Sequence, residues 1–185
     1  MSTLHHPSRR QLLASAAILS AGFGLAGCGE SQPKQPSASE LAAFWALKLP
    51  LAGPDSDGKK IELATFQGHP LLVNFWATWC PPCVAEMPML NRFYAERGAR
   101  DWQCLGLTAQ DTRSRVNRFL ARAPVAYPVA LTGARGMEIS RTLGNTSFET
   151  PDGALPFTVL FDANGRITRS KIGQLHISDL TAWLG

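Results

Sequence analysis

A buried strand that runs directly into a pair of cysteines is the feature that most constrains this chain. Residues 70–76 form a continuous apolar run after Gly68, which predicts a central strand buried on both faces. The sequence Cys80-Pro81-Pro82-Cys83 follows, and helices tolerate proline in their first turn. Apolar residues then recur at helical spacing over residues 84–97. The sequence therefore predicts a strand, a short turn and a helix in direct succession, with both cysteines at the start of the helix.

The rest of the chain continues this alternation of strands and helices. Residues 102–108 predict a second buried strand, and a β-α-β order implies a right-handed crossover and a parallel pair. Asn164-Gly165 predicts the turn of an antiparallel hairpin. The other expected elements are edge strands at 44–49 and 60–63, a helix at 112–121, a short strand at 127–131, a short helix at 135–143, hairpin strands at 157–162 and 166–172, and a last helix at 177–184. The expected fold class is therefore α/β.

The cysteine pair predicts thiol–disulfide exchange. This reaction needs one thiolate that attacks a disulfide and a second thiol that resolves the mixed disulfide. Free N–H groups and the positive end of the helix dipole favour a charged sulfur on the first cysteine of a helix. We therefore expect Cys80 to attack and Cys83 to resolve, with no cofactor other than their redox-active disulfide. Because Pro81 and Pro82 have no N–H, Cys83 is the nearest backbone donor, which favours a reductant.

A structural zinc site and a structural disulfide are two other possible uses of the cysteine pair. A structural zinc site needs four ligands, but Cys104 stands alone in a predicted strand, and His69 and His176 have no neighbour at metal spacing. We therefore predict no metal, and we expect Cys104 to be a small buried apolar side chain. A merely structural disulfide stays possible, although cysteines three positions apart at a helix start suit reversible chemistry better.

The string from Asn74 to Cys83, followed by Glu86-Met87-Pro88, closely resembles the TlpA/ResA-like branch of the thioredoxin superfamily. The resemblance covers about residue 51 onward, including Leu155-Pro156-Phe157-Thr158 and a segment inserted between the two motifs. It implies a thioredoxin-like fold with a central mixed sheet flanked by helices, and an insertion between the β-α-β half and the β-β-α half. It also implies a thiol:disulfide oxidoreductase that acts on protein disulfides.

For substrate binding, the resemblance implies a cis peptide bond between Leu155 and Pro156 that faces the cysteines. The residues alone favour a trans proline at the start of a strand. A cis bond would leave the Leu155 backbone open to pair with an extended substrate. We expect the substrate also to contact residues beside the attacking thiol, namely Trp79, Pro81 and Pro82.

Glu86 is the expected third catalytic residue. It lies three positions after Cys83, on the same helix face, and by itself it could be a solvated helix charge. The resemblance implies instead a partly buried carboxylate near the thiols. Asn74 strengthens this reading, because ordinary thioredoxins carry an aspartate there and asparagine cannot replace it as a proton acceptor. We therefore expect Glu86 to shuttle protons.

The N-terminus predicts export. Arg9 and Arg10 precede an uncharged apolar run that is short for a membrane span, and residues 1–28 are expected to be an export signal with a lipobox. Leu25-Ala26-Gly27-Cys28 resembles the bacterial lipobox, which implies a lipid anchor on Cys28; an uncleaved anchor helix and a plain signal peptide are the alternatives. Residues 29–40 predict a flexible tether, which leaves residues 41–185 for the domain.

The preferred function is a periplasmic or otherwise extracytoplasmic, membrane-anchored reductase, for example in cytochrome c maturation or copper-site assembly. Its electrons must come from outside the domain, because nothing in the chain binds a nicotinamide or flavin, and the family resemblance implies a membrane electron-transfer donor. A DsbA-like oxidant and a copper-binding chaperone that adds His176 to the two thiolates are the alternatives. The net charge of +4 shrinks with loss of the signal and gives no case for nucleic acid. We expect a monomer, and a solvated face rather than a docking face for Arg115, Arg118 and Arg122.

Overall fold

The computed structural model describes residues 33, 35–54, 56–98, 101–147 and 155–184, all within one compact unit that begins at Gln32. The predicted export signal and its Cys28 lie outside the described residues. The elements are α1 (Ala38–Trp45), β1 (Lys48–Pro50), β2 (Lys60–Glu62), η1 (Leu63–Phe66), β3 (Leu71–Trp76), α2 (Pro81–Arg97), β4 (Gln103–Thr108), α3 (Arg113–Arg122), β5 (Val129–Leu131), η2 (Gly133–Arg135), α4 (Gly136–Thr142), β6 (Phe157–Phe161), β7 (Ile167–Ile172) and α5 (Ile177–Leu184). In this described part, every helix is too short or too polar to cross a bilayer.

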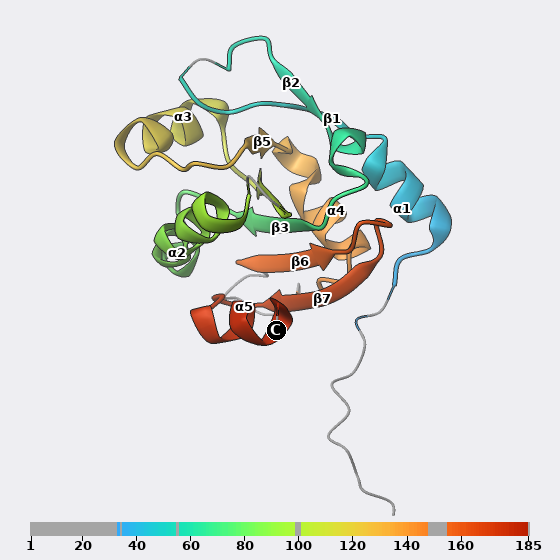
Figure 1. Cartoon of the computed structure of the whole chain (residues 1–185). Helices are drawn as coiled ribbons and strands as arrows, with labels where there is room; N and C mark the ends of the chain where they lie inside the picture. Colours follow the sequence, from blue (N-terminus) through green and yellow to red (C-terminus); the bar gives the residue numbers. More distant parts are fainter. Residues whose placement is uncertain (1–32, 34, 55, 99–100, 148–154, 185) are drawn as a thin grey trace, which may run out of the picture. The chain divides into compact units, whose positions relative to one another are not determined.

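A five-stranded mixed sheet occupies the centre of the domain (Figure 1). Its strand order is β5-β4-β3-β6-β7, and β1 and β2 form a separate antiparallel pair. The β3–β4 and β4–β5 pairs are parallel, whereas β6 runs antiparallel to β3 and β7. All six residues of β3 are buried, as expected for a strand between two sheet neighbours and two helical layers. The predicted parallel pair, the hairpin and the mixed α/β class are confirmed.

Alternate residues of β3 point to opposite faces of the sheet, and one face carries α2 and α3. On that face Asn74 hydrogen-bonds to Glu86 of α2, and Trp76 packs against Phe119 of α3 with ring centroids 5.4 Å apart. In Figure 1 these two helices lie on the left of the sheet, while α1 and α4 lie on the right. The face that carries α2 is therefore the one on which the cysteine helix is anchored.

Aromatic packing fixes α1 on the other face. The ring of Phe161, at the end of β6, lies 5.4 Å from Phe44 and 5.1 Å from Trp45. The hairpin turn packs under the same helix, and Gly165 has a positive φ of 75° there. A Cβ at Gly165 would approach Trp45 Nε1 to 2.9 Å, so the Asn-Gly turn suits both the backbone conformation and the close contact.

The folded domain begins before Leu41, so the tether expected over residues 29–40 is wrong in its last part. Ser37 and Glu40 form a capping box at the start of α1, and Gln35 exchanges two hydrogen bonds with the Ile167 backbone at 2.5 and 3.1 Å. The serine-to-glutamate spacing signals a helix start, but the polar, proline-containing composition suggested a linker. The strand expected at 44–49 is wrong in its first half, because Phe44 and Trp45 end α1.

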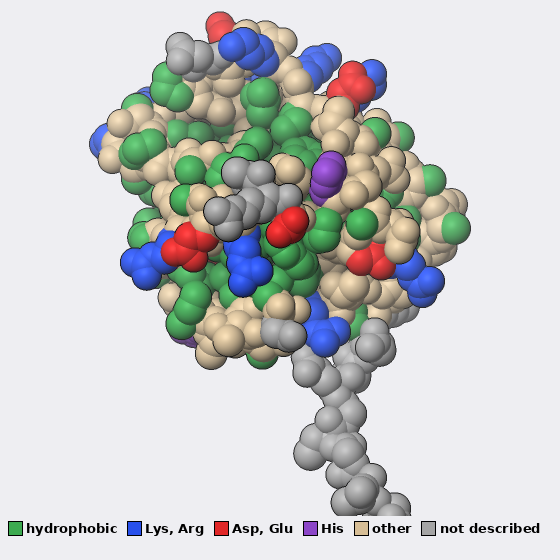
Figure 2. Space-filling model, viewed as in Figure 1, with side chains coloured by type: hydrophobic (Ala, Val, Ile, Leu, Met, Phe, Trp, Pro, Cys, Tyr) green, Lys and Arg blue, Asp and Glu red, His purple; other side chains and the backbone are tan. Residues whose placement is uncertain are grey.

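The other expected elements are present, with shifted ends. The helix expected to carry Pro81 and Pro82 in its first turn begins at Pro81 and ends at Arg97, and Pro88 lies inside it. On the face drawn in Figure 2, basic and acidic side chains of the described residues are interspersed, with apolar side chains between them. The three arginines considered as a docking face are exposed on α3. The expectation that they form a solvated face rather than a docking face stays a prediction.

Candidate active site

The two cysteines lie at the start of α2, just after the short loop that connects β3 to this helix. Cys80 is the N-cap residue of α2, Pro81 and Pro82 are its first two residues, and Cys83 lies in the first turn. The two sulfurs form a disulfide, with the Cα atoms 5.3 Å apart. Cys83 is fully buried, whereas 4% of Cys80 is exposed. An incoming molecule therefore reaches the Cys80 sulfur more easily, as its expected role in attack requires.

Few backbone donors point at the Cys80 sulfur. The Cys83 N–H donates to Cys80 Sγ at 3.3 Å, and the two intervening prolines have no N–H to offer. This confirms the sequence-based expectation that Cys83 supplies the nearest donor. A thiolate on Cys80 would consequently receive less stabilisation than one at the start of a helix with ordinary residues in its first turn.

The loop between β4 and α3 supports the residues that precede Cys80. The Thr78 N–H donates to Asp111 Oδ2 at 2.8 Å, and Trp79 Nε1–H donates to the Gln110 carbonyl at 3.3 Å. Gln110 has a positive φ of 54°, and Trp79 keeps half of its surface exposed. Sequence reasoning missed Asp111 and Gln110, because only the parallel β3–β4 pairing brings the two loops together. Their local pattern indicates no more than a helix start.

The peptide bond between Leu155 and Pro156 is cis, which confirms the expectation from the family resemblance. Pro156 immediately precedes β6, and the pairing of Phe157 with Phe75 puts it at the end of β3 from which the cysteine loop departs. The Pro156 carbonyl accepts a hydrogen bond from the Gly173 N–H at 2.8 Å. From the described residues, no group hydrogen-bonds to the backbone of Leu155. Leu155 is largely buried, with 7% of its surface exposed, so pairing of its backbone with a substrate stays a prediction.

Glu86 is buried between α2 and the sheet, with 1% of its surface exposed, so it is not a solvated helix charge. Its Oε1 accepts a hydrogen bond from Asn74 Nδ2 at 2.7 Å, and its Oε2 accepts one from the Leu175 N–H at 2.6 Å. Burial raises the pKa of Glu86 from its ordinary value of 4.5 to about 7, although both hydrogen bonds and the Lys171 charge oppose this rise. A carboxyl group with this pKa can accept and donate protons near neutral pH.

Asn74 connects Glu86 to the neighbouring strand. Its side-chain amide also donates to Thr158 Oγ1 at 3.1 Å, in register with the β3–β6 pairing. Sequence reasoning identified Asn74 and Glu86 but missed Thr158 and Leu175 as their partners. Both contacts join residues more than eighty positions apart, so the sequence carries no local signal of them.

Stability is expected to depend on the charge of Glu86. Between pH 4.5 and about 7 the unfolded chain releases the Glu86 proton while the folded protein keeps it, so rising pH favours unfolding. We expect this group alone to lower the free energy of unfolding by roughly 3 kcal/mol across that window. Urea denaturation of the oxidised protein at a series of pH values measures the effect. Glu86→Gln should remove this pH dependence of the free energy of unfolding. Glu96→Gln, on the exposed part of the same helix, should retain it. Equal pH slopes in the wild type and in both variants would contradict the effect of burial.

The remaining cysteine and the possible metal ligands complete the description of the site. Cys104 is a free, buried thiol in β4, and burial raises its pKa, as expected for a small core side chain. In the described ranges, no three His, Cys, Asp or Glu side chains gather as a metal site would require.

Comparisons with known proteins agree with this site. The family model described as Redoxin matches residues 34–184. The thiol-disulfide oxidoreductase ResA of Bacillus anthracis is 33% identical over 130 residues, which cover 70% of each chain. The thiol:disulfide interchange protein DsbE of Vibrio cholerae is 36% identical over 119 residues, which cover 64% of this chain and 58% of that protein.

Solved structures share the fold. StoA from Bacillus subtilis superimposes with a TM-score of 0.56 at 20% identity, covering 75% of this chain and 96% of StoA. A secreted Mycobacterium tuberculosis disulfide oxidoreductase gives a TM-score of 0.58 at 17% identity, covering 80% of this chain and 98% of that protein. These likenesses confirm the fold expected from the sequence.

Proposed function

The chain belongs to the Redoxin family and is a thioredoxin-like thiol:disulfide oxidoreductase, and on this premise we propose that it reduces protein disulfides outside the cytoplasm. The observation that carries the proposal is the disulfide of Cys80 and Cys83 at the start of α2, with the buried carboxyl group of Glu86 one helical turn further on. A reversible disulfide whose first sulfur has few N–H donors favours a reductant over an oxidant.

The proposed reaction starts from the reduced pair. The Cys80 thiolate attacks a substrate disulfide, whose S–S bond breaks while a mixed disulfide forms, and the released substrate sulfur takes up a proton. Glu86 then accepts the Cys83 proton, and the Cys83 thiolate attacks the Cys80 sulfur. The second substrate thiol leaves, and two electrons have passed from the cysteine pair to the substrate. A carboxyl group with a pKa of about 7 suits both directions of this proton transfer.

The substrate is proposed to bind beside Cys80 as an extended segment. Trp79 is half exposed next to the disulfide, and Pro81 is exposed on the same turn. The Leu155 backbone before the cis Pro156 is proposed to pair with a substrate strand, and Pro82, the second residue of α2, is proposed to contact the substrate beside Cys80. These contacts involve mainly the substrate backbone and its disulfide, so they suit several protein substrates.

The electrons are proposed to come from a membrane donor, and the cysteine pair is the sole redox group we assign. Relatives that share this architecture include a secreted disulfide oxidoreductase, which supports a location outside the cytoplasm. The DsbA-like oxidant remains the rival in which electrons flow the other way. We propose protein disulfides as the substrate class, and we take the haem-attachment cysteines of c-type apocytochromes as the example to test.

A peptide assay tests the proposed reaction. The reduced full chain is expected to open the disulfide of a synthetic Cys-x-x-Cys-His peptide, which carries the haem-attachment spacing, with one peptide reduced per protein. Thiol titration of the separated peptide and protein gives the stoichiometry. A matched peptide with alanine in place of histidine is the control. Failure to reduce either peptide contradicts the reductase function, whereas equal reduction of both removes only the preference for haem-attachment sites.

Membrane attachment through Cys28 is a separate proposal. A lipid chain contributes about 0.8 kcal/mol for each CH₂ group buried in the bilayer, so Cys28→Ser should move the protein from the membrane to the soluble fraction. Fractionation and detection of the mature chain measure this shift, with Cys104→Ala as a control that leaves the lipobox intact. Retention of Cys28→Ser in the membrane would favour the uncleaved anchor helix instead.

A further inference from the structure

The loop between β7 and α5 connects three parts of the site through its backbone. It donates three hydrogen bonds: from Gly173 to the Pro156 carbonyl at 2.8 Å, from Leu175 to Glu86 Oε2 at 2.6 Å, and from His176 to Asp179 Oδ2 at 2.7 Å. Gly173 has a positive φ of 92°, which turns the chain out of β7. The position of Leu175 against Glu86 therefore depends on how both ends of this loop are held.

An ion pair holds the two ends together. Lys171 Nζ on β7 lies 2.5 Å from Asp179 Oδ2 on α5, and these side chains are 30% and 24% exposed. The ion pair between Lys48 and Glu62 is much more open, at 62% and 51% exposure. Salt and solvent screen the Lys171–Asp179 pair less, so its charges act more strongly on buried neighbours.

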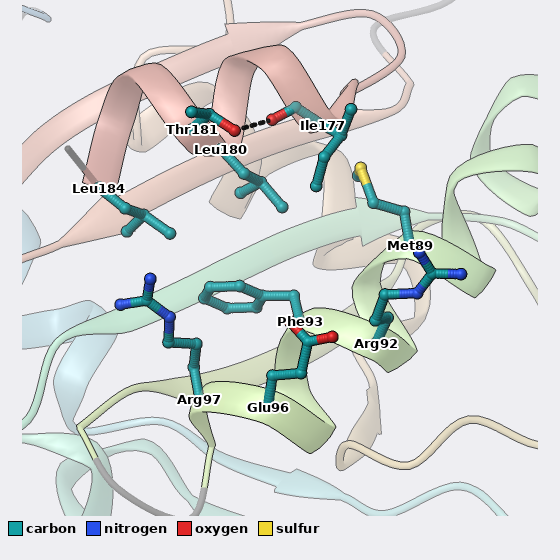
Figure 3. A pocket seen from close by; sticks show the side chains of 9 residues that line it. All are labelled: Met89, Arg92, Phe93, Glu96, Arg97, Ile177, Leu180, Thr181 and Leu184. Atoms are coloured by element: carbon teal, nitrogen blue, oxygen red, sulfur yellow. Dashed lines mark hydrogen bonds between the residues drawn. The ribbon is translucent and has the colours of Figure 1, made fainter.

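Apolar packing fixes α5 only in part. Figure 3 shows Leu180 of α5 facing Phe93 of α2, with the other side chains spread around a groove between the two helices. The groove has a volume of about 310 Å³. The first turn of α5 is held in addition by polar contacts, since Asp179 Oδ2 accepts hydrogen bonds from Lys171 Nζ and from the His176 N–H.

The charged groups that face Glu86 come from several elements. Lys171 contributes from β7, and its ammonium lowers the pKa of Glu86. Arg92 of α2 and His176 of the loop line an opening of about 390 Å³ to which Glu86 and Leu175 also belong. Asn74 from β3 is neutral, and the Tyr127 and Cys104 side chains are buried with raised pKa values, so both stay neutral near pH 7. Lys171 is thus the cation whose charge acts on the carboxylate, and Asp179 is its partner.

We propose that Lys171 and Asp179 are positioning residues for proton transfer at Glu86, an inference that rests on the function proposed for Glu86. The Lys171 charge favours the ionised carboxylate, and Asp179 moderates that charge by pairing with it. Asp179 also fixes the loop that presents the Leu175 N–H to the carboxylate. Together they set the pH at which Glu86 can take the proton of Cys83, although neither touches the sulfur atoms in the reaction.

Two substitutions test the proposal because they shift the titration of Glu86 in opposite directions. Lys171→Met removes the positive charge, so the pKa of Glu86 should rise above that of the wild type. Asp179→Asn keeps an oxygen for the His176 N–H but leaves Lys171 unpaired, so the pKa should fall. The pKa of Glu86 is expected to shift by roughly half a unit in each variant, because solvent partly screens the charges of Lys171 and Asp179. The Glu86 carboxyl carbon, followed by NMR in the oxidised full chain as pH is varied, reports the midpoint directly.

The control is Lys48→Met, which breaks the exposed ion pair and should leave the Glu86 midpoint unchanged. The proposal is supported if the NMR midpoint of Glu86 shifts in opposite directions in the two variants. The midpoint of the pH–rate profile of disulfide reduction should then shift in the same direction as the NMR midpoint in each variant. No shift, or shifts in the same direction, would overturn it, because a merely structural ion pair would loosen the loop equally in both. A Glu86→Gln variant with an unchanged pH–rate profile would instead overturn the function proposed for Glu86, and the NMR titration keeps the two failures apart.

Discussion

A Cys80→Ser variant is expected to lose disulfide reduction completely and to form no mixed disulfide with substrate. A serine hydroxyl stays protonated at neutral pH and cannot replace a thiolate as the attacking group. Cys83 remains in this variant, but it is fully buried. Thiol–disulfide exchange with a model disulfide, followed by non-reducing electrophoresis, measures both losses.

The complementary variant, Cys83→Ser, should still attack and should then accumulate the mixed disulfide, because the resolving thiol is missing. Mass spectrometry of the trapped species identifies the sulfur that carries the substrate. Cys104→Ala serves as the control, since its buried thiol in β4 takes no part in the proposed reaction. An adduct on Cys83 in the Cys80→Ser protein would reverse the assignment of the two roles.

The cysteine pair is expected to have a reduction potential near that of thioredoxin, roughly −270 mV, rather than near the −120 mV of DsbA. One backbone N–H, that of Cys83, reaches the Cys80 sulfur, and a charged Glu86 would oppose a thiolate nearby. A less stable thiolate raises the thiol pKa and lowers the stability of the reduced pair, which makes the potential more negative. The difference of about 150 mV corresponds to roughly 7 kcal/mol for two electrons.

Equilibration with dithiothreitol or glutathione buffers gives this potential directly. Pro82→Ala adds an N–H in the first turn of α2, so it should stabilise the thiolate and move the potential toward that of DsbA. Pro88→Ala adds an N–H further along the same helix and should leave the potential unchanged. A wild-type potential near −120 mV would contradict the reductase and favour the oxidant.

Sequence patterns sufficed for the features that depend on neighbouring residues. The apolar run of β3, the prolines at the start of α2 and the Asn-Gly turn each act within a few positions, so the strand, the helix and the hairpin were predictable. The attacking and resolving roles are predicted from the order of the cysteines along the helix, and the two cysteine variants test them. The cis bond before Pro156 was different, because the residues alone favoured a trans proline and only the family resemblance indicated otherwise.

Local reasoning failed where two weak signals competed. Ser37 and Glu40 fit a helix cap, yet the surrounding Ser, Gln and Pro suggested a tether. The deciding contact is made by Gln35 with the Ile167 backbone, on a strand that lies 132 positions away in the sequence. Contacts at such separation give no periodic pattern, so the start of the domain could not be read from composition.

For the chemistry of the site, too, some features depend on the sequence alone and others on the tertiary structure. Sequence by itself determined which groups are present: two thiols at a helix start, a carboxyl group one turn further on, and an asparagine where ordinary thioredoxins have an acid. Tertiary structure decided how Glu86 behaves, because its pKa depends on burial, on the Leu175 N–H 89 positions away and on the Lys171 charge. Desolvation and Coulomb interactions act through space, so only the folded arrangement of β3, α2 and the loop after β7 sets the pH range in which Glu86 titrates.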